Sequence, residues 1–524
     1  MWLAISMANF GGIIQLTGAS WLMSEITNSR EWVALVQAST ALPIVLFALF
    51  AGAIADNFPR RRVLYVAYSI IISASLALLI TTTFFTITPK GLLLFTFLIA
   101  SGSSLSVPSW QASIGDILPR HEVPHAVLLN NISFNTARAL GPALAGVIIA
   151  LAGGCNATFG VNALSYMPLL FVLAQWKPPQ QNRTLPREKI LSAAATGIRY
   201  VAMSPSLCKV LLKTMLFGIG SIAILALLPI VARELLHGGP REYGILLGAF
   251  GAGAVAGAGF NTLLKRHFSL ETISRLSFVG MAVTLAGIGT SRIVWITAPL
   301  LLIGGATWVL SFSNYNSILQ LSSPRWVVGR VLSNYQVFVS GGFVIGSYCW
   351  GRLADYSGLT SGLLGASLFL LAMGLVCSRF PIENPGQLNL TPHGNWEEPP
   401  LPSFLTRNSG PIVISIEFHV KDENIPSFLH AVERLRQIRL RNGAKNWSLT
   451  RDIHECHRWI ISYQFATWTE YVRHNHRTTK DDANAVIALW ALHAGSEPPR
   501  ITRLVERQSD WKPETPHPST NYPS

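Results

Sequence analysis

Long apolar runs separated by short polar breaks are the feature that most limits how this chain can fold. About 20 residues at 1.5 Å rise carry a helix across the hydrocarbon core of a bilayer. A helix also satisfies its own backbone hydrogen bonds where no water is present. The runs therefore predict twelve membrane-spanning helices, at 2–24, 33–54, 62–84, 91–112, 126–152, 157–176, 209–232, 241–263, 270–290, 295–320, 328–352 and 360–380.

The composition divides the chain into a membrane part and a water-exposed part. Only 13% of the 524 residues are charged, against about 25% in soluble proteins. The charges concentrate after residue 380, and Pro-rich segments mark the boundary at 381–387 and 397–403. We expect a linker over 381–410, an α+β domain over 411–507 and a disordered tail over 508–524.

The net charge of +14 does not indicate nucleic-acid binding, because no basic face with interleaved aromatic residues is present. Basic residues instead gather in one set of alternate loops, including Arg60–Arg62, Arg120, Lys265 and Arg266. Cytoplasmic loops of membrane proteins carry such an excess. This pattern predicts a multi-pass protein of the bacterial inner membrane, with both termini and the C-terminal domain in the cytoplasm.

The longest internal loop, 177–208, splits the membrane part into six plus six helices, 1–176 and 209–380. Within it, residues 187–202 place apolar side chains at helical spacing, with basic residues on the other side. This pattern is typical of an amphipathic helix lying on the cytoplasmic membrane surface. A helical linker without membrane contact is the alternative.

The two halves contain similar segments at corresponding positions. SWQASIGDILPR (109–120) joins the fourth and fifth predicted helices, and NYNSILQLSSPR (314–325) joins the tenth and eleventh. An amide follows each Pro-Arg pair in the next helix, at Asn130–Asn131 and at Asn334. Such repeats predict two bundles that rock about a central cavity.

The segment GAIADNFPRRR (52–62) links the second and third predicted helices. It resembles the loop signature of the major facilitator superfamily. Gly52 permits close helix packing, and Asp56 can pair with Arg60, Arg61 or Arg62 or cap a facing helix. We expect these five residues to act in gating, whereas the alternative is that the arginines only fix the orientation.

A related segment, GRLADYSG (351–358), ends the eleventh predicted helix. The resemblance implies that the second and eleventh helices occupy equivalent places in the fold. Asp355 is then the counterpart of Asp56 on the outer face. An ordinary helix-end aspartate is the alternative interpretation.

The fifth predicted helix carries ARALGPALAG (137–146), which resembles the Gly-Pro motif of exporters in the same superfamily. Pro142 is expected to bend the helix, and Gly141 and Gly146 to permit tight packing. Arg138, one turn earlier, is expensive in lipid and needs a cavity or a partner. It is the best candidate for contacting an anionic or polar substrate group, with a structural ion pair as the alternative.

Further polar residues within the predicted helices are candidates for lining a substrate cavity. Together with Arg138, the predicted set is Gln15, Asn130, Asn131, Asn135, Asn314 and Asn334. No Asp or Glu lies deep in the predicted spans, so the sequence does not identify a proton-coupling group. No GxxxxGK[ST] loop is present, which makes an ion gradient, by default of protons, the expected energy source.

Residues 1–380 as a whole resemble the enterobactin-exporter-like branch of the superfamily, often called transmembrane secretion effectors. ASWLMSEITNS (19–29), residues 34–56, VPSWQASIGDILPR (107–120) and residues 130–146 carry the resemblance. It implies a secondary exporter of a small molecule such as a siderophore, metabolite or drug. No cofactor and no metal are expected.

The order β-α-β-β-α-β in the tail predicts a ferredoxin-like unit. Strands are predicted at 411–420, 446–453, 458–465 and 500–506, and helical regions at 427–443 and 467–492. The unit resembles antibiotic-biosynthesis monooxygenase domains, which implies pairing into a homodimer. His474 and His476 point in different directions on a helix, so they predict no metal site.

Three functions remain open at this point. The first is export by alternating access, and the second is a membrane-tethered enzyme acting through the tail. The third is a ligand sensor that signals through the tail. We predict no catalytic residues, and we interpret the five scattered cysteines as buried free thiols.

Overall fold

The computed structural model describes residues 1–119, 121–176, 190–324, 326–382, 390–391, 398–400 and 405–506. The chain divides into two compact units, Met1–Pro385 and Gly386–Ser524. Most of the predicted Pro-rich linker, the predicted tail over 508–524 and the start of the predicted amphipathic helix lie outside the described residues.

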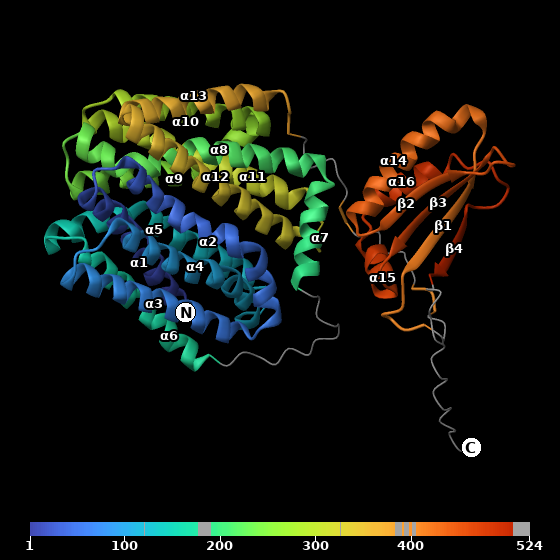
Figure 1. Cartoon of the computed structure of the whole chain (residues 1–524), viewed down its shortest axis with the longest axis horizontal. Helices are drawn as coiled ribbons and strands as arrows, with labels where there is room; N and C mark the ends of the chain where they lie inside the picture. The colour runs from blue at the N-terminus through green and yellow to red at the C-terminus, as the bar shows by residue number, and fades with distance from the viewer. Residues whose placement is uncertain are drawn as a thin grey trace, which may run out of the picture. The chain divides into compact units, whose positions relative to one another are not determined.

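In its described residues the first unit consists of helices and short connections, and each predicted span corresponds to one of its long helices (Figure 1). Most of the helices extend beyond the apolar runs, because polar turns continue them outside the hydrophobic stretch. The helices are α1 (Trp2–Ile26), α2 (Arg30–Asn57), α3 (Arg60–Phe84), α4 (Pro89–Ile117), α5 (Val123–Ala152), α6 (Asn156–Gln175), α7 (Ile190–Ala202), α8 (Pro205–Ile230), α9 (Pro240–His267), α10 (Leu270–Thr290), α11 (Val294–Leu321), α12 (Val328–Ser357) and α13 (Leu359–Ser378).

Ten of these helices, among the described residues, are long and apolar enough to cross a membrane. The other two long helices are α1 and α12, and both contain polar residues, such as Gln15 in α1 and Arg330 and Arg352 in α12. The unit is therefore a polytopic helical membrane fold, and the count of twelve spans stays a prediction.

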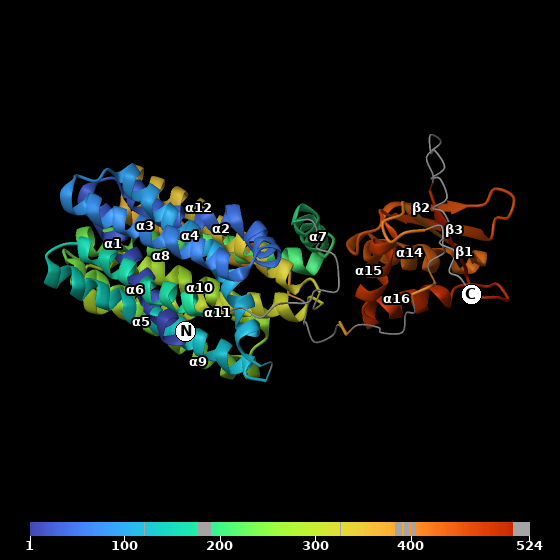
Figure 2. The same cartoon turned by 90° about the horizontal axis from the view of Figure 1, so that it is seen from below.

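Helices α1–α6 pack together in one group and α8–α13 in a second group (Figures 1 and 2). Contacts between α2 and α12 and between α5 and α9 join the two groups. Consecutive spanning helices run in alternate directions, so their connections collect at two ends. We call them the Gly358 end, where Gly358 connects α12 to α13, and the Pro59 end, where Pro59 precedes α3.

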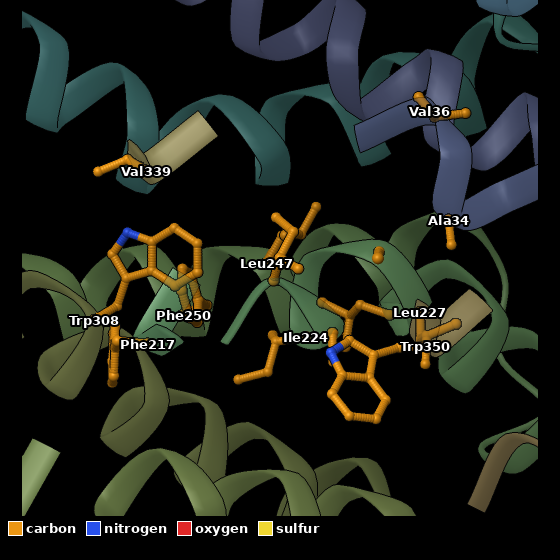
Figure 3. Close-up of a cluster of buried hydrophobic side chains, with 14 of the residues drawn as sticks. Ala34, Val36, Phe217, Ile224, Leu227, Leu247, Phe250, Trp308, Val339 and Trp350 are labelled. Atoms are coloured by element: carbon orange, nitrogen blue, oxygen red, sulfur yellow. The ribbon is translucent and has the colours of Figure 1, made fainter. Parts of the chain in front are cut away.

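Aromatic and aliphatic side chains fill the interior of the first unit (Figure 3). Trp308, Phe217 and Phe250 lie together in the second group of helices. Trp350 of α12 donates its indole N–H to the carbonyl of Ile219 in α8, at 2.7 Å. This bond satisfies the polar atom of a large ring that is otherwise buried in an apolar core.

Helix α7 lies at the Pro59 end and packs against α2, α8 and α12. Tyr200 and Val201 are buried, and the Tyr200 ring meets the edge of Trp326 with 5.5 Å between centroids. The helix over Ile190–Ala202 therefore has its buried face against protein. Contact of the other face with lipid stays a prediction.

The second unit contains a four-stranded antiparallel sheet in the order β2-β3-β1-β4. Ile412, Ile414, Ile416 and Phe418 of β1 alternate with less buried residues and form a core with the helices. The elements are β1 (Ile412–His419), α14 (Ile425–Arg441), β2 (Lys445–Arg451), β3 (Arg458–Phe465), α15 (Trp468–Arg477), α16 (Lys480–Trp490) and β4 (Arg500–Val505).

The region predicted to be helical over 467–492 contains two helices, α15 and α16, because Thr479 and Asp482 form a capping box that starts a new helix. The expectation that all five cysteines are buried is wrong. The cysteines are free, but only Cys155 and Cys377 are buried, whereas Cys349 and Cys456 are exposed. Composition alone does not distinguish a thiol in the core from one on the surface.

Candidate functional site

At the Gly358 end, the last turn of α12 contacts the first turn of α2. The Asp355 carboxylate accepts hydrogen bonds from the Arg30 backbone N–H at 3.0 Å and from the Ser29 hydroxyl at 2.9 Å. The first N–H groups of a helix have no partner within the helix and attract negative charge. Asp355 thus supplies from α12 the cap that α2 lacks.

Ion pairs between the two helix groups surround this cap. Arg30 bonds Glu234 at 2.8 Å, and it also donates to the carbonyl of Ala354 at 3.0 Å. Arg352 bonds Glu31 at 3.0 Å. These side chains are partly exposed, so each pair contributes at most about 1 kcal/mol. Such a set of weak contacts holds the end together and remains reversible.

A π-helical turn, Val231–Leu235, extends α8 and carries Arg233 and Glu234 toward the first group of helices. The Arg233 guanidinium donates to the carbonyl of Ser24 in α1. Turns of this type occur frequently at functional sites because they re-aim side chains. Here the turn places Glu234 against Arg30 of α2 and Arg233 against Ser24 of α1.

Glycines permit the close approach of helices between the groups. A Cβ atom at Gly351 would lie 2.6 Å from the Cβ of Ala34 and 3.1 Å from the Cα of Glu31. A Cβ atom at Gly146 would lie 2.8 Å from the carbonyl oxygen of Pro240. The backbones of α2 and α12, and of α5 and α9, therefore contact each other almost directly.

The predicted Gly-Pro motif lies along the α5–α9 contact. The carbonyl oxygen of Pro142 would be 2.9 Å from a Cβ atom at Gly244, and Gly141 faces Ile13 of α1. Helix α5 is continuous through Pro142. The packing roles of Gly141 and Gly146 thus have a structural basis, while a bend at Pro142 stays a prediction.

Arg138 lies near the middle of α5, about 21 Å from either helix end at 1.5 Å per residue. Its guanidinium carbon lies over the ring of Trp308, 5.5 Å from the centroid. Trp308 belongs to α11, so this cation–π contact joins the two helix groups. No carboxylate among the described residues forms an ion pair with Arg138, and the predicted alternative of a structural ion pair therefore finds no support there.

Among the described residues, no hydrogen bond joins Arg138 to the other cavity candidates. Gln15 is buried on the same face of α1 as Gly11 and Gly18, and this face packs against α6. Asn314 is buried two turns after Thr307, which contacts Gly280 of α10. Asn334 donates to the carbonyl of Arg330.

Three candidates lie on α5 with Arg138. Asn130 is half-buried and Asn135 is exposed, while the side chain of Asn131 lies outside the described set. The Nε2 atom of Gln15 and both amide atoms of Asn314 are buried without a hydrogen-bond partner in the described structure. A substrate role for this set of amides stays a prediction.

At the Pro59 end the structure describes only part of the predicted gating motif. The backbones of Gly52 and Asp56 belong to α2, but the Asp56 side chain lies outside the described set. Arg61 donates to the carbonyl of Ala174 at 2.9 Å and lies over the Tyr65 ring. Arg60 is half-buried and Arg62 is exposed.

A buried ion pair within the second group of helices was not predicted from the sequence. The Lys213 ammonium lies 2.7 Å from the Glu271 carboxylate, and Lys213 is 2% exposed. Glu271 also accepts from the Ile382 backbone N–H at 3.1 Å. A lysine inside the apolar run of α8 was the available signal, but its partner 58 residues later has no local marker.

In the C-terminal unit, His474 is buried and its Nε2 lies 2.5 Å from the Arg439 guanidinium. Burial, and then the charge of Arg439, lower the pKa of His474 well below its ordinary value. Trp468 is buried against Tyr471. These contacts are typical of a core, and no group of three metal-ligating side chains occurs among the described residues.

Known proteins resemble this chain in sequence over most of its length. A family model described as transmembrane secretion effector matches residues 1–510. The staphyloferrin A transporter of Staphylococcus aureus is 23% identical, over 69% of this chain and 91% of its own length. The multidrug efflux pump Tap of Mycobacterium tuberculosis is 24% identical, over 76% of this chain and 96% of its own length.

Solved structures show a similar fold at low sequence identity. A bacterial homolog of the human lysosomal transporter Spinster, inward-facing and occupied, has a TM-score of 0.56 at 12% identity, covering 72% of this chain and 96% of that one. A POT family transporter in complex with 5-aminolevulinic acid has a TM-score of 0.57 at 14% identity, covering 72% and 95%. The chain therefore belongs to the transmembrane secretion effector family of major facilitator transporters, which are membrane transporters and not enzymes.

Proposed function

We propose that the protein is a secondary exporter that moves a small molecule across the bacterial inner membrane by alternating access. The observation that carries this proposal is the Asp355 cap on α2, together with the ion pairs around it. These polar contacts join the two helix groups at the Gly358 end, and water can replace each of them. Such contacts can form and break in each transport cycle.

In this proposal the two helix groups are bundles of six spans each, 1–176 and 209–380. Both termini face the cytoplasm, so the Gly358 end is the outer end. The structure then corresponds to a state closed to the outside, in which Asp355, Glu31 and Glu234 hold the outer end together.

The spacing Gly-x-x-x-Asp occurs at both Gly351–Asp355 and Gly52–Asp56. Helices α2 and α12 lie against each other in opposite directions, so the end of α2 faces the start of α12. Asp56 is therefore proposed to cap α12 when the Pro59 end closes, as Asp355 caps α2 here. Arg60, Arg61 and Arg62 would stabilise that closed state.

The cargo is proposed to be a siderophore, metabolite or drug. Relatives that match more than two thirds of this chain include a staphyloferrin A transporter and a multidrug efflux pump, and this supports export of small molecules. The energy source is proposed to be a proton gradient, because the sequence contains no nucleotide-binding loop.

The C-terminal unit is proposed to be a ferredoxin-like, monooxygenase-related domain that serves dimerisation or regulation. Its strand order β2-β3-β1-β4 and the helices between the strands support the ferredoxin-like assignment. The sheet face bearing Val413, Ser415 and Glu417 is opposite the helices and would meet a second copy. A tethered enzyme is disfavoured, since His474 is buried and occupied by Arg439.

Metabolite profiling tests the proposed function. A deletion strain and its parent are grown iron-poor and iron-rich, and extracellular and intracellular compounds are compared. If the protein is an exporter, at least one compound should be absent from the medium of the deletion strain and should accumulate in its cells. Unchanged profiles under both conditions would contradict export of a metabolite.

A further inference from the structure

The charge of Arg138 is balanced by no acidic residue in the described part of the chain. It stands near the centre of α5, and its described side-chain contact is the Trp308 ring at 5.5 Å. A charged side chain at this depth in a membrane protein is expensive, and it normally faces a partner or a cavity. The face of an aromatic ring attracts a cation but does not neutralise it.

The surface that Arg138 meets is strongly aromatic. Trp308 stacks on Phe343 with 5.2 Å between centroids, and it meets Phe312 at 5.0 Å and Phe250 at 5.7 Å. Phe217 contacts Phe312 in turn. The guanidinium therefore faces one ring, Trp308, which belongs to a cluster of five rings contributed by the second group of helices.

These two features select one kind of ligand. Guanidinium N–H groups form strong, charge-assisted hydrogen bonds to carboxylate and similar oxygens. Aromatic walls bind flat apolar groups through stacked and edge-to-face contacts. A cationic ligand would be repelled by Arg138, and a small hydrophilic anion would leave the rings unused.

Resting on the proposed exporter function, we infer that the Arg138–Trp308 contact is a binding subsite for organic anions that carry a flat aromatic or apolar group. The anion bonds Arg138 of the first helix group, and the ring packs on Trp308 of the second. Binding therefore replaces the direct contact between the groups with one that runs through the cargo. This links occupancy of the subsite to the relative position of the two groups.

Binding of three probes of similar shape tests this inference. They are 2-naphthoate, neutral 2-naphthamide and cationic 2-naphthylmethylammonium, with inorganic phosphate as an anion without a ring. The readout is the rise in the thermal unfolding midpoint of the full-length protein in detergent, titrated to give an apparent Kd. The naphthoate is expected to bind more tightly than the other three.

Variants assign the effect to the two residues. Arg138→Gln is expected to weaken naphthoate binding roughly tenfold to a hundredfold, the range of a charged hydrogen bond, and to leave naphthamide binding unchanged. Arg138→Lys and Trp308→Phe should keep part of the affinity, and Trp308→Leu should lose it. Arg292→Gln, an exposed arginine at the Gly358 end, is the matched control.

Equal effects of all four probes, including no effect from any of them, would overturn the inference, as would unchanged naphthoate binding in Arg138→Gln. The metabolite profiles of the deletion strain test the inference independently. If the deletion strain retains only cationic or neutral compounds, export stands and the anion subsite is wrong. If it retains no compound, the proposed function itself fails.

Discussion

The carboxylate of Asp355 lies 3.0 Å from the backbone nitrogen of Arg30 and accepts its hydrogen bond, so one helix group caps a helix of the other. These residues are 325 positions apart in the chain. Glu234 holds the side chain of the same Arg30. Arg30, at the start of α2, is therefore bound through both its backbone and its side chain.

Replacing Asp355 with Asn should open the Gly358 end. Loss of a charged helix cap costs about 1 kcal/mol, which is roughly a fivefold shift in a two-state equilibrium. Distances between spin labels at Phe84→Cys and Trp295→Cys, exposed residues of the two groups at this end, should lengthen in a cysteine-free background. Asp422→Asn in the C-terminal unit is the control, and an unchanged distance distribution in Asp355→Asn would refute the gating role.

Replacing Asp56 with Asn should have the opposite effect. If Asp56 caps α12 only when the Pro59 end is closed, its loss favours the state in which the Gly358 end is closed. The same label pair should then show a larger population of short distances. Lengthening of the distance, as in Asp355→Asn, would contradict the proposed equivalence of the two motifs.

A branched side chain at Gly351 should prevent closure of the Gly358 end. Gly351→Val places atoms within contact distance of Ala34 and the Glu31 backbone, which cannot move without displacing α2. Transport should fall strongly while the protein still inserts and folds. Gly259→Val is the matched control, because a Cβ atom at Gly259 meets nothing within 4 Å.

Breaking the Lys213–Glu271 pair should destabilise the second group of helices. Lys213→Met leaves Glu271 without its closest partner, and removal of one member of a buried pair costs roughly 3 kcal/mol or more. The thermal unfolding midpoint should fall. The double variant Lys213→Met, Glu271→Gln should recover part of the loss, whereas Lys265→Met on an exposed site should have no effect.

His474 should make the C-terminal unit less stable at acidic pH. Its folded-state pKa lies below the unfolded value of about 6.5, because burial and Arg439 oppose protonation. The unfolded state therefore binds more protons, and stability is lost as the pH falls below about 6.5, by at most about 1.4 kcal/mol per pH unit. Unfolding of the C-terminal unit in the full-length protein, followed from pH 8 to 5, should lose part of this slope in His474→Gln but not in the exposed His430→Gln.

The sequence predicted the helical spans well, because membrane insertion depends on hydropathy summed over a local window of about 20 residues. The helices observed for the 62–84 and 270–290 runs begin and end within two residues of the predictions. The spacing of Gly351 and Asp355 also marked the end of α12 as a special position. The break at Thr479 was missed, although its capping box with Asp482 is a local signal.

The sequence by itself thus determined which segments are helices and where the chain changes from membrane to water-exposed composition. Only the tertiary structure decided the partners, since Arg30 meets Glu234, Lys213 meets Glu271, and Arg138 meets Trp308 instead of an acid. The physical reason is that helix formation is decided within each segment, whereas an ion pair or a cation–π contact depends on which helices pack together. That choice is made by the shapes of whole helix surfaces, through close approaches such as Gly351 on Ala34, and no window of sequence contains both partners.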